Sequence, residues 1–190
     1  KGSLLESRYD EYNQVFNRCI AKIKDTYIPK ESICVICGDI FHHKLQISSN
    51  GIILFNNFIS NLASLMPTFI IQGNHDLIQE NNDDNNDLIK AILSNDISNV
   101  IYLNKTGTYQ YDNINFGLVS IKDILQQNTS YGLVDTLPKF PEPKKNFINI
   151  ALSHSTVKNS YLHNYTKNYH GIPIEWFKGY DIVMLGDIHL

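Results

Sequence analysis

The sequence predicts an α/β fold in which sheets are covered by helices. Short apolar runs rich in β-branched residues alternate with longer segments of helical periodicity in the first half of the chain. Strand-like runs separated by turn residues follow in the middle, which adds locally paired strands to the prediction. The length of 190 residues suits one domain, which we expect to occupy residues 1–190.

Two helix–strand units are expected in the first half. Helices are expected at 8–27 and 50–65, and each is followed by a buried strand, at 33–37 and 68–72. Pro67 ends the second helix, and a glycine follows each strand. An acidic, asparagine-rich segment at 80–87 is expected to be a solvated loop that leads into a helix at 87–93.

The second half predicts pairing between neighbouring strands. Alternating patterns place three short strands at 100–103, 107–111 and 114–119. Asp112-Asn113 marks a hairpin turn. An irregular, proline-rich connection is expected at 130–145. Two more buried strands follow at 147–153 and 180–185, with a short helix between them at 173–177.

Composition limits the function classes. The formal net charge is −3, whereas proteins that only grip nucleic acid are more often basic; an enzyme that holds phosphate through bound cations is not excluded. The three cysteines, without a signal peptide, favour a reduced, intracellular protein of the cytoplasm or nucleus. No apolar run approaches the ~18 residues of a membrane span, so we expect no membrane association.

Side chains that can bind metal follow four of the predicted buried strands. Because ligands of α/β sheets gather outside the carboxyl ends of the strands, we expect these side chains to share one crevice. They are Asp39, Asn74, His154, Asp187 and His189.

The residue types suit metal-assisted hydrolysis of a phosphate ester. Two divalent ions ~3.5–4 Å apart would activate water and neutralise the phosphoryl oxygens, with Asp39 as the candidate bridge. A mixed nitrogen and oxygen ligand set favours Mn²⁺, with Fe²⁺, Zn²⁺ or Mg²⁺ as alternatives. His75 directly follows Asn74 and is the candidate general acid. Asp76 is expected to hold the loop or orient a neighbouring histidine. The alternative for all of these candidate site residues is that they are ordinary turn residues at strand ends.

The order of these motifs resembles that of the calcineurin-like metallophosphoesterases. The motifs are Gly38-Asp39, Gly73-Asn74-His75-Asp76, His154 and Gly186-Asp187-Ile188-His189. The Gly-Asp-Ile-Phe-His run at 38–42 and the segment 148–154 resemble the Mre11/SbcD nuclease branch of that superfamily. In that branch His42 would lie near the substrate or an ion, and a solvated loop residue is the alternative.

The resemblance implies a four-layer α/β/β/α sandwich with two Mn²⁺-type ions. It implies Asp39 as the bridge, Asn74, His154 and Asp187 on the second ion, His189 on the first, and His75 as the proton donor. It also implies DNA as substrate, a role in DNA repair, and pairing as a homodimer and with an ATPase.

The chain departs from the family pattern at two points. The family opens with an Asp-x-His motif, which this chain lacks, and Asp187 stands where the family commonly has histidine. We therefore expect a sandwich lacking its first strand and the C-terminal end of the domain, with a weak or absent first ion.

The resulting hypothesis is a metal-dependent phosphodiesterase, a DNA exo- or endonuclease. A phosphomonoesterase or cyclic-nucleotide phosphodiesterase is the alternative within the superfamily. A catalytically silent, phosphoesterase-like binding domain is the alternative outside the enzymes, and the missing Asp-x-His motif favours it for this chain.

Overall fold

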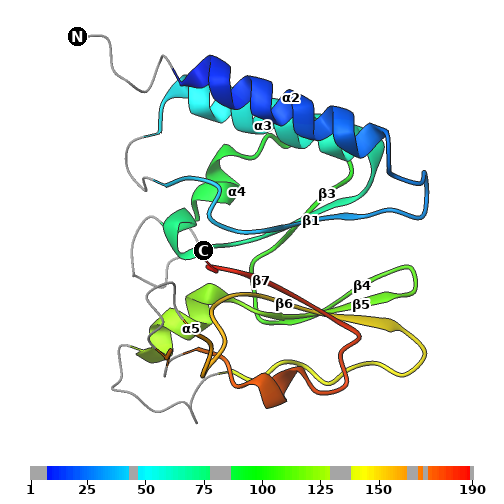
Figure 1. Cartoon of the computed structure of the whole chain (residues 1–190), viewed down its shortest axis with the longest axis vertical. Helices are drawn as coiled ribbons and strands as arrows, with labels where there is room; N and C mark the ends of the chain where they lie inside the picture. Colours follow the sequence, from blue (N-terminus) through cyan, green and yellow to red (C-terminus); the bar gives the residue numbers. More distant parts are fainter. Residues whose placement is uncertain are drawn as a thin grey trace.

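Four layers, in the order helix, sheet, sheet and helix, make up the described part of the computed structural model (Figure 1). The structure describes residues 8–42, 47–77, 87–128, 138–161, 167–168 and 171–188. Helices α2 (Tyr9–Lys24) and α3 (Ser49–Leu65) cover the first sheet, and α5 (Ile121–Asn128) with a 3-10 helix, η4 (Ile174–Phe177), lies against the second. This arrangement confirms the predicted α/β/β/α fold class.

The first sheet is wholly parallel in the order β1-β2-β3. Its strands are β1 (Cys34–Cys37), β2 (Thr68–Ile71) and β3 (Val100–Leu103). The prediction that the run 100–103 pairs locally is wrong, because β3 joins β2 in parallel after the short helix α4 (Leu88–Ile92). Parallel strands are packed on both faces, and β3 accordingly contacts the helix layer through Val100 and the second sheet through Leu103.

The second sheet has the order β4-β5-β6-β7. Its strands are β4 (Gly107–Tyr111), β5 (Ile114–Val119), β6 (Ile148–His154) and β7 (Ile182–Gly186). Strands β4 and β5 form the predicted antiparallel hairpin around Asp112, which adopts the left-handed conformation that the turn requires (φ 48°). Strands β5, β6 and β7 are parallel, so β6 and β7 end at the same edge of the sheet.

Alternating side chains divide the core into layers. Phe69 and Ile71 of β2 pack between the two sheets, whereas Ile70 faces the helices. In β6, Ile150 and Leu152 face the gap between the sheets, and the same period of two places His154 on that side.

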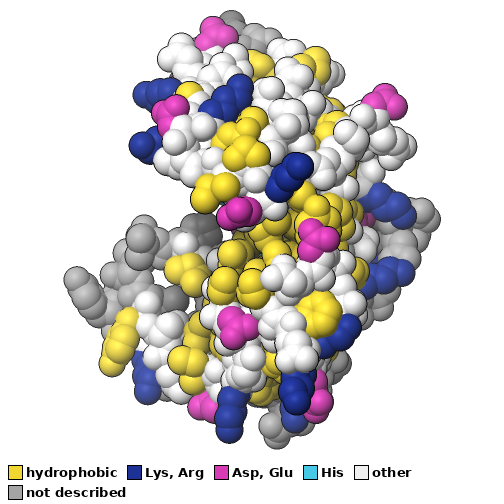
Figure 2. All heavy atoms as spheres, turned by 90° about the vertical axis from the view of Figure 1, so that its right-hand side faces the viewer, with side chains coloured by type: hydrophobic (Ala, Val, Ile, Leu, Met, Phe, Trp, Pro, Cys, Tyr) yellow, Lys and Arg dark blue, Asp and Glu magenta, His cyan; other side chains and the backbone are white. Residues whose placement is uncertain are grey.

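At the amino ends of the parallel strands, this intersheet core reaches the surface as a band of apolar side chains (Figure 2). Among the described side chains visible on this face there is no histidine. The chemistry-bearing residues gather at the opposite edge, beyond the carboxyl ends.

The elements differ in some details from the sequence-based expectations. Helix α5 was not predicted, although its Ile121 and Ile124 are buried at helical spacing. Strand β1 is half-buried and β7 is half-buried to exposed, although both were predicted to be buried, because each lies at the edge of its described sheet. The predicted loop at 80–86 lies outside the described residues.

Asp87, predicted to be solvated, is buried instead. It caps α4 by accepting a hydrogen bond from the Lys90 backbone N–H (3.0 Å). Both of its oxygens also accept from the Tyr102 hydroxyl (2.8 and 2.7 Å). Burial, reinforced by the Asp87 charge, raises the pKa of Tyr102 well above its ordinary value, so the phenol remains a donor.

None of the described helices combines the length and apolar character that crossing a membrane requires.

Candidate metal centre

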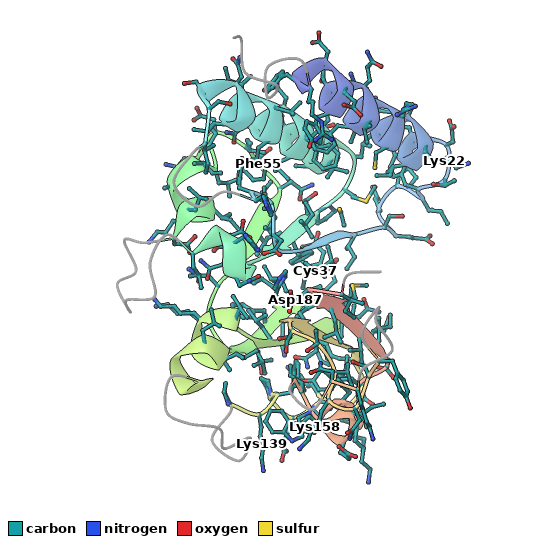
Figure 3. The ribbon with its side chains drawn as sticks, turned by 60° about the vertical axis from the view of Figure 1, so that its left-hand side comes forward. Lys22, Cys37, Phe55, Lys139, Lys158 and Asp187 are labelled. Carbon is teal, nitrogen blue, oxygen red and sulfur yellow. The ribbon has the colours of Figure 1, made fainter. Side chains whose placement is uncertain are left out.

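Four strands deliver polar side chains to one point where the two sheets meet. Asp39 follows β1 and Asn74 follows β2 in the first sheet, while His154 ends β6 and Asp187 follows β7 in the second. Figure 3 shows Cys37, the last residue of β1, close to Asp187 at this junction. The structure therefore brings together four of the five predicted ligands, and His189 lies outside the described residues.

The ligand atoms converge on the His154 imidazole. Its Nε2 lies 3.2 Å from Asn74 Oδ1, 3.3 Å from Asp39 Oδ2 and 4.0 Å from Asp187 Oδ1. Ligand atoms bound about 2.1 Å from a common ion lie roughly 3.0–3.4 Å apart at octahedral or tetrahedral angles. The two shorter separations fit one shared cation, with Asp187 slightly more open.

The hydrogen bonding of the buried His154 ring also suits a cation. Its side chain is 1% exposed, and Nδ1 lies 2.7 Å from the Cys37 carbonyl oxygen. A carbonyl can only accept, so Nδ1 carries a hydrogen, and in the neutral form of the ring the lone pair is therefore on Nε2. Three acceptor oxygens then surround an acceptor nitrogen, an arrangement that a divalent ion satisfies.

Close backbone packing allows this convergence. A side chain at Gly38 (φ 83°) would approach the Gly73 nitrogen to 2.5 Å and His154 Nδ1 to 2.7 Å. A side chain at Gly186 would clash with the Cys37 carbonyl oxygen and with His154 Nδ1. The two glycines therefore let β1 and β7 close around the imidazole.

Both carboxylate ligands have left-handed backbone conformations, with φ of 54° at Asp39 and 63° at Asp187. Aspartate tolerates this region better than most residues, because its short side chain can bond nearby backbone groups. Here Asp39 Oδ1 accepts from the His75 backbone N–H at 3.1 Å, which leaves Oδ2 facing His154.

Asp76 holds the first two loops together. Its fully buried carboxylate accepts backbone N–H groups of Asp39 (2.9 Å), Gly73 (2.9 Å), Ile40 (3.0 Å) and Phe41 (3.3 Å). Burial raises the pKa of this carboxyl, and the hydrogen bonds from Gly73, Phe41 and Ile40 partly offset the rise. Asp76 thus contacts the backbone of Asp39 rather than facing the cluster.

The His75 side chain is fixed against the loop that follows β1. Its Nδ1 lies 2.9 Å from the His42 carbonyl oxygen, and the two imidazole rings stack with centroids 5.2 Å apart. Because the carbonyl accepts from Nδ1–H, the opposite nitrogen, Nε2, remains available for substrate. His42 is exposed, so the histidine pair borders solvent.

The β1 cysteines supply no ligand to the described cluster, whose members are carboxylate, amide and imidazole groups. Both thiols are free and half-buried, and burial raises the pKa of each. The contribution of Cys37 is its main-chain carbonyl, which the sequence could not indicate because every residue carries one. The sequence likewise gave no signal for the four backbone donors that Asp76 gathers.

Comparison with known proteins finds two similarities in sequence. A sequence profile described as calcineurin-like phosphoesterase matches residues 6–190. An uncharacterized protein of Acanthamoeba polyphaga mimivirus is 35% identical over 185 residues, which are 96% of this chain. The chain spans 14% of the length of that curated relative.

Proposed function

This chain belongs to the calcineurin-like phosphoesterase family, and we propose that it is a metal-dependent phosphodiesterase of the nuclease type, related to the Mre11/SbcD branch. Family membership implies metal-dependent hydrolysis of phosphoesters. The observation that supports the proposal most strongly is the convergence of Asp39, Asn74 and Asp187 oxygens on His154 Nε2. The Gly-Asp-Ile-Phe-His run at 38–42 favours the nuclease branch.

Under this proposal, Asp39, Asn74, His154 and Asp187 would hold one divalent ion. Asp39 would also bridge to a second ion, with His189 as its further ligand. A set of imidazole, amide and carboxylate ligands without thiolate suits Mn²⁺, and Fe²⁺, Zn²⁺ and Mg²⁺ are alternatives. Such ions supply Lewis acidity that activates water and neutralises the phosphoryl oxygens.

His75 would act as the general acid. The His42 carbonyl holds Nδ1–H, so a protonated His75 presents Nε2–H on the other side of the ring. When water attacks phosphorus and the bond to the ester oxygen breaks, that proton would pass to the departing oxygen. Stacking on His42 restricts the ring plane and thereby helps to aim the proton.

A general acid suits a nucleic-acid phosphodiester, because its sugar-hydroxyl leaving group needs a proton. DNA as the substrate is proposed from the resemblance to the nuclease branch. DNA repair, homodimer formation and an ATPase partner are further proposals from the same resemblance.

The decisive experiment is a nicking assay on supercoiled plasmid with Mn²⁺ or with EDTA. We expect slow, Mn²⁺-dependent relaxation, because one nick per plasmid is detectable even when a first ion is weakly held. Asp39→Asn should abolish it; asparagine keeps the left-handed backbone and the shape but loses the charge. Asp112→Asn, an exposed turn position that is also left-handed, is the matched control.

A parallel comparison of bis-p-nitrophenyl phosphate with p-nitrophenyl phosphate tests the substrate class. Preference for the bis-ester supports a phosphodiesterase, whereas hydrolysis of the mono-ester alone would identify a phosphomonoesterase instead. Mn²⁺ binding without hydrolysis of either ester or plasmid would contradict the proposal and favour a silent binding domain.

A further inference from the structure

A two-armed element, joined by two isolated bridges, begins directly after His154. We name it the wing; its described residues are 155–161, 167–168 and 171–172. Tyr161 lies seven residues beyond His154, so their Cα atoms are at most about 25 Å apart. The wing therefore lies within about 25 Å of the metal centre along the chain, a length that a strand of several nucleotides can span.

Hydrogen bonds and apolar packing attach the base of the wing to the core. The Ile172 N–H donates to the Thr156 carbonyl (2.9 Å), and the Lys158 N–H donates to the Ile172 carbonyl (3.0 Å). Ile172 is 1% exposed in the cluster beneath the second sheet, against which Val157 also packs. The buried Asn168 amide donates to Thr156 Oγ1 at 2.8 Å, which closes the base with a polar bond.

The tip places an aromatic ring and a cation side by side. Backbone bonds from Asn168 N–H to the Ser160 carbonyl (2.7 Å) and from Asn159 N–H to the Asn168 carbonyl (2.6 Å) bring the two arms together. Tyr161 and Lys167 then face each other across an antiparallel bridge. Directly opposed residues project to the same face with Cβ atoms roughly 4.5–5.5 Å apart.

Both tip side chains are presented to solvent. Tyr161 is 74% exposed, the largest fraction among the described large hydrophobic side chains, and Lys167 is also exposed. A single exposed tyrosine is common on protein surfaces and by itself indicates nothing. An exposed ring next to an ammonium, on a hydrogen-bonded base, matches what single-stranded nucleic acid requires: a stacking platform beside a positive charge.

We propose that Tyr161 and Lys167 form a binding subsite for single-stranded nucleic acid, the ring stacking on one base and the ammonium contacting an adjacent phosphate. The subsite rests on the proposed function, since it would hold the strand whose phosphodiester enters the metal centre. Stacking accepts any base, so the subsite selects unpaired strands rather than a sequence.

Fluorescence anisotropy with a labelled oligothymidylate of about 12 nucleotides tests this in EDTA, where hydrolysis does not occur. Tyr161→Leu removes the ring and should weaken binding about tenfold, whereas Tyr161→Phe should bind as the wild type does. Lys167→Met should weaken binding and lower the slope of log affinity against log salt by about 0.7. Matched controls on the far layer are Tyr12→Leu, 44% exposed on α2, and Lys22→Met.

Further probes define the ligand. An abasic oligonucleotide should bind Tyr161→Leu and wild type equally, because it offers no base to stack. A blunt duplex should bind more weakly than the single strand and be insensitive to Tyr161→Leu. Oligouridylate and oligothymidylate compared in parallel show whether RNA or DNA is preferred.

The wing inference is overturned if Tyr161→Leu binds the oligonucleotide as tightly as Tyr12→Leu does, or if the wild type does not bind it. Mn²⁺-dependent hydrolysis of bis-p-nitrophenyl phosphate by the wild type is scored separately. Failure of that reaction counts against the proposed function alone, so the two failures are distinguishable. Circular dichroism of each variant confirms that the fold is retained.

Discussion

Replacing Asp76 with asparagine should loosen the two loops that carry Asp39 and Asn74. In the wild type, one carboxylate oxygen accepts from Asp39 and Gly73, and the other accepts from Ile40 and Phe41. Asparagine keeps one acceptor oxygen but turns an NH₂ group toward the other pair of backbone donors. Two hydrogen bonds are lost at a site with no exposed surface, and two buried donors lose their acceptor.

The expected loss of stability follows from those two bonds. A hydrogen bond to a charged group contributes about 1.5–3 kcal/mol, so removing two costs about 3–6 kcal/mol. A neutral amide is less costly to bury than a carboxylate, which offsets part of this loss. We expect the free energy of unfolding to fall by about 3 kcal/mol, equivalent to roughly 6–12 °C in Tm for a domain of this size.

Urea unfolding without metal, followed by circular dichroism, measures the first effect, and Mn²⁺ titration at low urea measures the second. Because Asp76 holds the Asp39 backbone, the Mn²⁺ affinity of Asp76→Asn should fall about 10–100-fold. The control, Asp112→Asn in the exposed hairpin turn, should stay within about 0.5 kcal/mol of wild type. A destabilisation of Asp76→Asn below about 1 kcal/mol with unchanged Mn²⁺ affinity would refute the reasoning.

Three further outcomes are expected. His75→Asn should lower kcat on the bis-ester by about 10²–10⁴ while Mn²⁺ binding is retained, and an unchanged kcat would remove His75 as the general acid. Gly38→Ala should destabilise the protein and abolish Mn²⁺ binding, because the new methyl group would clash with His154. Its control is Gly51→Ala within α3, where the new methyl group makes no such clash. Urea unfolding should show that Gly51→Ala stabilises the protein by about 0.5–1 kcal/mol. A thiol-reagent assay of the native protein at mildly alkaline pH should show that exposed Cys19 reacts before the two β1 cysteines. Burial raises the pKa of both β1 thiols and so lowers the fraction present as reactive thiolate. Equal rates for all three cysteines would contradict the described burial.

The fold was largely predictable because its strands are distinct in local sequence. Apolar runs closed by glycine located β1 and β2, and a two-residue turn located the β4–β5 hairpin. The pairing of β3 could not be predicted in the same way, since the sequence of a short apolar strand does not specify which strand it pairs with. The burial of Asp87 also escaped, because its hydroxyl partner, Tyr102, approaches only in the folded chain.

The candidate centre was predictable for a different reason. Parallel strands of one sheet end at a common edge, so the polar residues that end or follow β1 and β2, and those that end or follow β6 and β7, gather at one edge of each sheet. Packing of the two sheets then brings these two edges together. What the sequence could not supply were main-chain partners, above all the Cys37 carbonyl that fixes the His154 tautomer. Main-chain groups are the same at every position. Only the close backbone approach at Gly38 and Gly186 brings these particular groups next to His154.

Calorimetric titration of the metal-free protein with Mn²⁺ tests most directly whether four strand ends build one cation site. We predict about one tightly bound ion per chain, lost or weakened at least about 100-fold in both Asp39→Asn and Asp187→Asn, and unchanged in Asp112→Asn. Asparagine suits the left-handed backbone at all three positions, so the comparison isolates the ligand charge. Absence of binding, or binding that both ligand variants leave intact, would contradict the account.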